Sequence, residues 1–226
     1  MSIKGSGEPT EWREIDRSEN GVGWIPYPEE TMQRASHALV DDGDVWLVDP
    51  VDAEGIDDLL GELGDVEGVV ILLDRHKRDS ATFANRHDVP VWIPSFMDGV
   101  AEDVDAPVER FRHDLADTGF SVHEVFNNRL WQEGLLYSED SGVLLVPEAV
   151  GTTEYFRTGS NPLGVHFALR LTPPSNLTRL SPDRLLVGHG DGIHEDATAR
   201  LQDAVDHARA RAPTLYWKNL KMMVSG

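Results

Sequence analysis

Six consecutive polar residues, Asp-Arg-His-Lys-Arg-Asp at positions 74–79, are the first candidates for chemistry in this sequence. They follow the apolar run Val69–Leu73, which is typical of a strand covered on both faces. Carboxylates and an imidazole can bind a metal ion or move protons, and guanidinium groups can bind an anion. A buried strand that delivers all of these groups to one point indicates a binding or catalytic site at its end.

A second candidate lies near the other end of the chain, where RLLVGHGDG places His189 between two glycines after another apolar run. The sequence has no cysteine, so disulfides, thiolate chemistry and cysteine-ligated zinc are excluded. Any metal ion must therefore be held by His, Asp and Glu.

The elements of the first half follow a strand–helix alternation. Residues 35–49 predict two strands joined by an Asp-Asp-Gly-Asp turn. Helical spacing of apolar residues then predicts a helix around Ile56–Leu63, before the buried strand at Val69–Leu73. Asp79 and Ser80 are residue types that cap a helix, and a short strand is expected at 91–93.

The second half predicts a helix-like segment at 107–119, followed by three short strands at 120–126, 134–137 and 143–146. Prolines make 151–176 irregular, as in a loop that wraps over the molecule or contacts another copy. A buried strand within 182–192 and a long closing helix at 194–212 complete the chain.

The amino-acid composition limits the classes of partner that this protein can bind. Forty acidic against 20 basic residues give a net charge of −20, which repels nucleic acid and anionic membranes. No segment has the length and hydropathy of a membrane span, and the first 20 residues have no apolar core of a secretion signal, so a cytoplasmic protein is expected. The low lysine content and evenly spread acidity are typical of proteins from salt-loving microbes.

Three landmarks resemble the metallo-β-lactamase fold superfamily, which includes the glyoxalase II-like hydrolases. HALVDDGDVWLVDP is similar to its opening hairpin, LLDRHKRDSATFANRHDVPVWIP to its metal-binding loop, helix and strand, and RLLVGHGDG to its late Gly-His-Gly strand. The resemblance implies an α/β fold, a four-layer α/β/β/α sandwich. It implies one domain over 1–226, with a core of roughly 36–208 and an irregular insertion at 151–176.

The resemblance also implies a rebuilt site. The first two histidine positions of the family loop become Asp74 and His76, its aspartate becomes Arg78, and its last histidine becomes Asp79. The family's third histidine should fall near 127–129, where there is none, and Glu148 stands where a bridging aspartate would be. Only His76 and His189 remain as the family has them, and the loop resembles that of a divergent branch with a degenerate motif.

Three arrangements of this site are open. In the first, one divalent ion (zinc, manganese or iron) is held by a subset of five ligands, and a metal-dependent hydrolase of an ester, thioester, amide or phosphoester follows. The candidate ligands are His76, Asp79, Glu148, His189 and Asp74. In the second, no metal is bound and the guanidinium groups of Arg75 and Arg78 pair with the carboxylates or bind an anionic small molecule, as in a pseudo-enzyme. In the third, these residues are solvated or cap a helix.

The partner expected in either functional case is a small molecule, as substrate or ligand. Apolar residues near the chain end, at 215–217 and 222–224, are consistent with a homo-oligomer contact or with packing against the sandwich. The histidines at 113, 123, 166, 194 and 207 have no spacing that suggests metal ligation.

Overall fold

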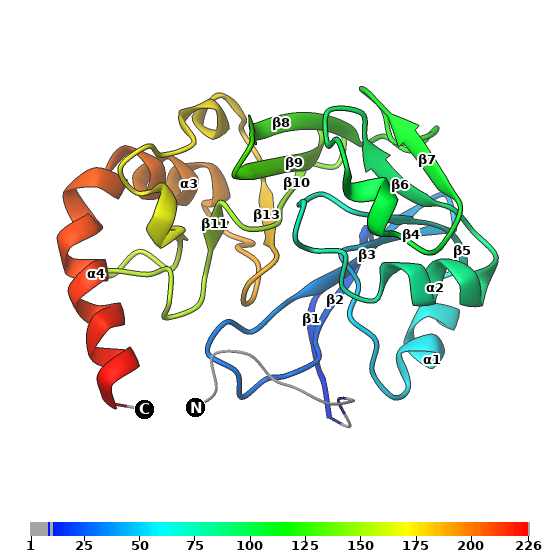
Figure 1. Ribbon diagram of the computed structural model, residues 1–226, viewed down its shortest axis with the longest axis horizontal. Coiled ribbons are helices and arrows are strands. Elements are labelled where there is room, and N and C mark those ends of the chain that lie inside the picture. Colours follow the sequence, from blue (N-terminus) through cyan, green and yellow to red (C-terminus); the bar gives the residue numbers. More distant parts are fainter. Residues whose placement is uncertain (1–8, 10, 226) are drawn as a thin grey trace.

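The computed structural model describes residue 9 and residues 11–225, which form four layers in the order helix, sheet, sheet, helix (Figure 1). The first sheet has seven strands, in the order in which they occur along the chain. They are β1 (Arg13–Ser18), β2 (Gly21–Ile25), β3 (Ser36–Asp41), β4 (Asp44–Val48), β5 (Asp65–Val70), β6 (Val91–Pro94) and β7 (Val108–Phe111). Helices α1 (Ile56–Gly61) and α2 (Ser80–His87) cover its outer face.

The second sheet has four strands in the order β13-β10-β9-β8. Their bounds are β8 (Ser121–Asn128), β9 (Trp131–Ser138), β10 (Val143–Val146) and β13 (Arg184–Val187). Helix α3 (Ala197–Asp206) packs on its outer face, and α4 (Ala208–Ser225) runs along that end of the molecule (Figure 1). The remaining elements are the short pair β11 (Val150–Gly151) and β12 (Gly164–Val165) and the 3-10 turns η1 (Val100–Asp103), η2 (Phe167–Leu169) and η3 (Ser175–Arg179).

Three apolar cores lie between the four layers. Strand β10 shows how the sequence builds them, because successive side chains of a strand point to opposite faces. Val143 and Leu145 enter the core between the two sheets, whereas Leu144 and Val146 enter the core beneath α3. The same alternation in β5 sends Val69 to the α1–α2 side. The predicted four-layer α/β/β/α sandwich is therefore confirmed.

Most predicted elements are present, but the segment at 107–119 is not a helix. Val108–Phe111 is strand β7, which pairs in parallel with β6 through the register Val91↔Val108. A strand of four residues at the edge of a sheet gains its stability from this pairing, which local periodicity does not record. The hairpin of β1 and β2, for which no strand was predicted, extends the sheet beyond β3 in the same way.

The predicted closing helix at 194–212 is two helices. Helix α3 begins at Ala197 and ends at Asp206, and α4 then continues to Ser225, past Pro213. Pro213 lies in the second turn of α4, where its missing N–H removes only one backbone hydrogen bond, so the helix is not broken there. Leu215 is buried, whereas Trp217 is 59% exposed, and the side chains at 222–224 lie outside the described residues.

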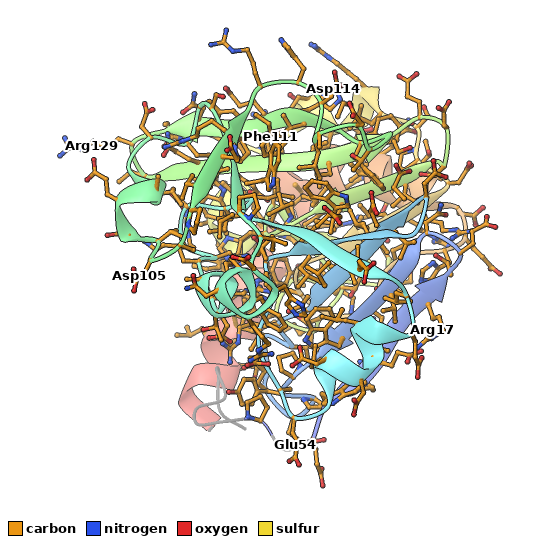
Figure 2. The ribbon with its side chains drawn as sticks, turned by 90° about the vertical axis from the view of Figure 1, so that its right-hand side faces the viewer. Arg17, Glu54, Asp105, Phe111, Asp114 and Arg129 are labelled. Carbon is orange, nitrogen blue, oxygen red and sulfur yellow. The ribbon has the colours of Figure 1, made fainter. Side chains whose placement is uncertain are left out.

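Charged side chains cover the outer surface. Figure 2, which faces the α1–α2 side, shows Arg17, Glu54, Asp105 and Arg129 pointing outward at the margins of the molecule. Among the described residues, no helix combines the length and apolar character that crossing a bilayer would require.

Candidate metal centre

Three side chains meet where strands of the two sheets end. His76 follows β5, Glu148 follows β10 and His189 follows β13. Strands β10 and β13 are parallel neighbours, so their carboxyl ends lie at the same edge of the sheet. Gly188 makes the close approach possible, because a Cβ atom there would lie only 2.1 Å from the carbonyl oxygen of Pro147. The topology thus brings His189 against Glu148.

The ligand atoms of this group lie within 4.8 Å of one another, and all three residues are buried. Nε2 of His76 is 2.9 Å from Oε2 of Glu148, and Nε2 of His189 is 2.8 Å from the same oxygen. Two imidazole nitrogens therefore converge on a single carboxylate oxygen. We call His76, Glu148 and His189 the His-Glu-His group.

The outer nitrogen of each ring already has a partner. Nδ1 of His189 lies 3.0 Å from the carbonyl oxygen of Met32, and Nδ1 of His76 lies 3.1 Å from Oδ2 of Asp49. Both partners accept hydrogen bonds, so each Nδ1 carries the proton and donates it. In a neutral ring this leaves the Nε2 lone pair facing an oxygen that also carries lone pairs. Only a cation between them, a proton or a metal ion, makes the arrangement favourable.

The lowered pKa of the Glu148 carboxyl group also favours a cation at this point. Burial alone would raise the pKa of its carboxyl group, but the charges of His189 and His76 and the hydrogen bonds to both rings outweigh burial. The pKa of Glu148 is therefore held well below its usual value. The group supplies one anionic oxygen donor and two nitrogen donors, a set that suits zinc, manganese or iron.

A fourth polar side chain contacts the group from the irregular segment. Nε2 of His166 is 3.3 Å from Oε1 of Glu148, the oxygen that the other two histidines do not contact. Its Nδ1 accepts a hydrogen bond from the backbone N–H of Ala168, which leaves the proton on Nε2. Burial lowers the pKa of His166 to about 4, so at neutral pH the ring is neutral and lies against the Glu148 carboxylate without adding a charge.

The structure brings three of the five predicted ligands together but places Asp74 and Asp79 elsewhere. Asp74 accepts hydrogen bonds from the Arg75 side chain and from the backbone N–H of Gln132. Asp79 stands at the start of α2 without capping it, and its carboxylate instead accepts the N–H of Asp52 at 2.8 Å. Both carboxylates thus fasten loops to neighbouring segments.

Of the two predicted anion-binding residues, Arg75 is exposed at the rim of the site, whereas the half-buried Arg78 is bonded to the main chain near it. The exposed guanidinium of Arg75 lies over the Trp131 ring, 4.1 Å from its centroid. Arg78 instead donates to the carbonyl oxygens of Ala35 at 2.6 Å, Asp49 at 2.8 Å and Gly188 at 3.4 Å.

The ion pairs expected of Arg78 with Asp74, Asp79 and Glu148 do not form: in the described part of the chain its guanidinium bonds carbonyl oxygens instead. Burial lowers the pKa of Arg78, and the charges of Asp49 and Glu148 act against that shift. These two charges influence the pKa of Arg78 because its guanidinium lies close to the site. Its hydrogen bonds hold together the start of β3 and the ends of β4 and β13.

Sequence reasoning did not assign Asp49 or His166 to the site. Asp49 had a signal, since the Asp-Pro at the end of the first hairpin is one of the family landmarks. His166 had none, because it approaches Glu148 only through the pairing of β11 with β12. No histidine stands at 127–129, which forms the tip of the β8–β9 hairpin.

The architecture and the position of the site at the sheet edge together define the metallo-β-lactamase fold. Solved structures with this fold are similar over nearly the whole chain, at low sequence identity. The DIM-1 metallo-β-lactamase exposed to ceftazidime has a TM-score of 0.60 and 13% identity, covering 92% of this chain and 99% of its own. The TMB-1 structure has a TM-score of 0.60 and 10% identity, covering 90% and 97%.

A metallo-β-lactamase from Pontibacter korlensis also has a TM-score of 0.60, with 12% identity over 87% of this chain and 99% of its own. No protein-family profile matches the sequence, and no curated protein does. The expected metallo-β-lactamase fold is thereby confirmed, and a group that could hold a divalent metal lies at its sheet edge.

Proposed function

We propose that this protein is a hydrolase that uses one divalent metal ion, held by His76, Glu148 and His189, to cleave an ester, thioester, amide or phosphoester. The convergence of two Nε2 atoms on one oxygen of Glu148 carries the proposal. Their outer nitrogens are committed to acceptors, so the inner lone pairs need a cation. When bound, a divalent ion supplies Lewis-acid chemistry that polarises a carbonyl or phosphoryl oxygen and lowers the pKa of water.

The protein's own residues have separate parts in this function. Asp49 and the carbonyl of Met32 hold the two imidazole rings with their Nε2 atoms inward. Arg75, exposed at the rim beside Trp131, is placed to bind an anionic group of the substrate. Arg78 contributes no ligand, because a guanidinium has no lone pair, and a second metal ion beside it is unfavourable.

Metal content tests the first part of the proposal. Protein purified without an affinity tag or chelator is expected to contain about one equivalent of zinc, manganese or iron, or to bind it when added. His189→Ala should lose this ion, whereas His113→Ala, at an exposed position, should keep it. A wild-type protein that contains less than about a tenth of an equivalent of transition metal, and binds none when it is added, would contradict the proposed hydrolase function.

Activity tests the second part. Hydrolysis of model aryl esters, thioesters, amides and phosphodiesters should rise with metal content and disappear in His189→Ala. Arg75→Ala should raise KM for an anionic substrate more than for a neutral one of the same shape. If the metal binds but no substrate class is cleaved, the alternative is a non-catalytic protein that binds an anionic small molecule.

A further inference from the structure

The buried carboxylate of Glu133 lies next to the His-Glu-His group but is not one of the three proposed metal ligands. Glu133 lies in β9 with none of its surface exposed. Its Oε1 accepts the backbone N–H groups of Glu148 and Ala149, both at 2.8 Å. Its Oε2 accepts the indole N–H of Trp131 at 2.6 Å. Three donors thus converge on one carboxylate, and two of them belong to the turn that carries Glu148.

The backbone of Glu133 reaches the other ligand-bearing loop. Glu133 forms a β-bridge with Leu73, whose carbonyl oxygen accepts the N–H of His76 at 2.9 Å. The next residue, Gly134, donates its N–H to the carbonyl of Leu72 at 2.8 Å. One residue therefore connects the loop of His76 by its main chain with the turn of Glu148 by its side chain.

The same carboxylate also holds the rim of the site. By accepting the indole N–H, the carboxylate orients Trp131. The centroid of the Trp131 ring lies 5.1 Å from that of the His166 ring. The guanidinium of Arg75 lies on the face of the same Trp131 ring. His166 in turn contacts the second oxygen of Glu148. The Glu133 side chain therefore acts on Glu148 in two ways. It accepts the backbone N–H of Glu148 directly, and it acts on the Glu148 carboxylate indirectly through Trp131 and His166.

We propose that Glu133 is a positioning residue for the metal ligand Glu148, setting its carboxylate where the Nε2 atoms of His76 and His189 meet. A carboxylate has two acceptor oxygens, which the three donors require, whereas an apolar residue or an amide cannot satisfy them all. The turn at 148–149 keeps its position because both of its N–H groups are bound to the same rigid oxygen. This inference rests on the proposed function of the His-Glu-His group as a metal site.

Glu133→Gln is the decisive variant, because the amide has the shape of the carboxylate but only one acceptor oxygen. Either the indole or the pair of backbone N–H groups then faces an NH2 group, and one contact must be given up. Metal affinity, measured by competition with a chromogenic chelator, should fall about tenfold to a hundredfold. The absorption spectrum of the cobalt-substituted protein should change, since it reports ligand geometry. Glu109→Gln, exposed on β7, is the matched control and should behave as wild type.

Two further measurements keep the result interpretable. The melting temperature of the metal-free variants separates a loss of folding from a loss of ligand geometry. Trp131→Phe removes only the indole donor and should weaken metal binding less than Glu133→Gln, with a spectral change of the same kind; it replaces Glu133→Gln if that variant does not fold.

The outcomes separate this inference from the proposed function. If the wild type binds no metal, the proposed function fails. If the wild type binds metal and a folded Glu133→Gln protein has the same affinity and cobalt spectrum, the positioning role is overturned while the metal site stands. If Glu133→Gln does not fold and Trp131→Phe matches the wild type in both, the positioning role is likewise overturned.

Discussion

Oδ2 of Asp49 lies 3.1 Å from Nδ1 of His76, on the side of the ring opposite to Glu148. The carboxylate is buried and its other oxygen accepts the backbone N–H of Leu72 at 3.1 Å, so it is fixed to the end of β5. This contact determines which nitrogen of His76 carries the proton, and hence which one is free for a cation.

Asp49→Asn should therefore weaken metal binding by about tenfold to a hundredfold while leaving the fold intact. The asparagine oxygen can still accept the N–H of Leu72, but its NH2 group then faces Nδ1 of His76. The ring must move its proton to Nε2, where it blocks the ligand position. Chelator competition measures the affinity, with Asp44→Asn, exposed at the start of β4, as the control. An unchanged affinity in Asp49→Asn would contradict the assignment of the tautomer.

Arg78→Lys should reduce the free energy of unfolding by about 1–3 kcal/mol, although the charge is kept. The guanidinium donates to the carbonyls of Ala35, Asp49 and Gly188, and a single ammonium group cannot reach all three with good geometry. Urea denaturation measures the loss, and Arg112→Lys, at an exposed position, should show almost none. Equal stability of both variants would mean that Arg78 does not hold the strand ends together.

His166→Phe should lower metal affinity by about tenfold and should alter the cobalt spectrum, with a smaller loss than in His189→Ala. Phenylalanine keeps the ring packing against Trp131 and Phe156 but removes the polar Nε2 atom that lies 3.3 Å from Oε1 of Glu148. Without this contact the carboxylate can rotate, so that Oε2 no longer stays at the point where both Nε2 atoms meet. A spectrum identical to wild type would show that His166 does not influence how Glu148 binds.

Stability between about pH 2 and 4 should depend on Asp203 of α3. Hydrogen bonds from Arg211, which outweigh burial, and from Asn161 lower the pKa of Asp203 to about 2, from 3.8 for the unperturbed group. The folded state thus binds fewer protons than the unfolded chain in this window. The stabilisation is complete above the unfolded pKa and is lost as pH falls through the folded pKa.

Asp203→Asn should therefore show a shallower loss of thermal stability on acidification than the wild type. Because Asp203 is partly exposed, solvent screening keeps the effect small. Thermal unfolding at a series of acidic pH values measures the two slopes, and Asp206→Asn, exposed on the same helix, is the control. Parallel slopes for all three proteins would contradict a folded-state pKa below the usual value.

Much of the fold could be predicted from sequence because its strands are recorded locally. Val143–Val146 is strand β10 with the predicted bounds, and the hairpin of β3 and β4 turns where a glycine among aspartates predicted it. His76 and His189 could also be singled out, since each follows an apolar run that ends at the sheet edge. Such features need only the residue types and their spacing along the chain.

The remainder depends on contacts between distant segments, which spacing does not encode. The pairing Val150↔Val165 brings the backbone N–H of His166 to the carbonyl of Ala149, and so places His166 beside the turn that carries Glu148. Asp74 and Asp79 are of the right type for ligands, yet the backbone donors of Gln132 and Asp52 bind them instead.

The sequence by itself determined where most strands lie and that thiolate chemistry is absent, because strand periodicity and composition are local properties; the layer order was implied by the resemblance to a known fold. Only the tertiary structure decided which carboxylates face the imidazoles and which secure the backbone. A carboxylate binds whichever donor the fold brings within reach, and those donors lie tens of residues away along the chain.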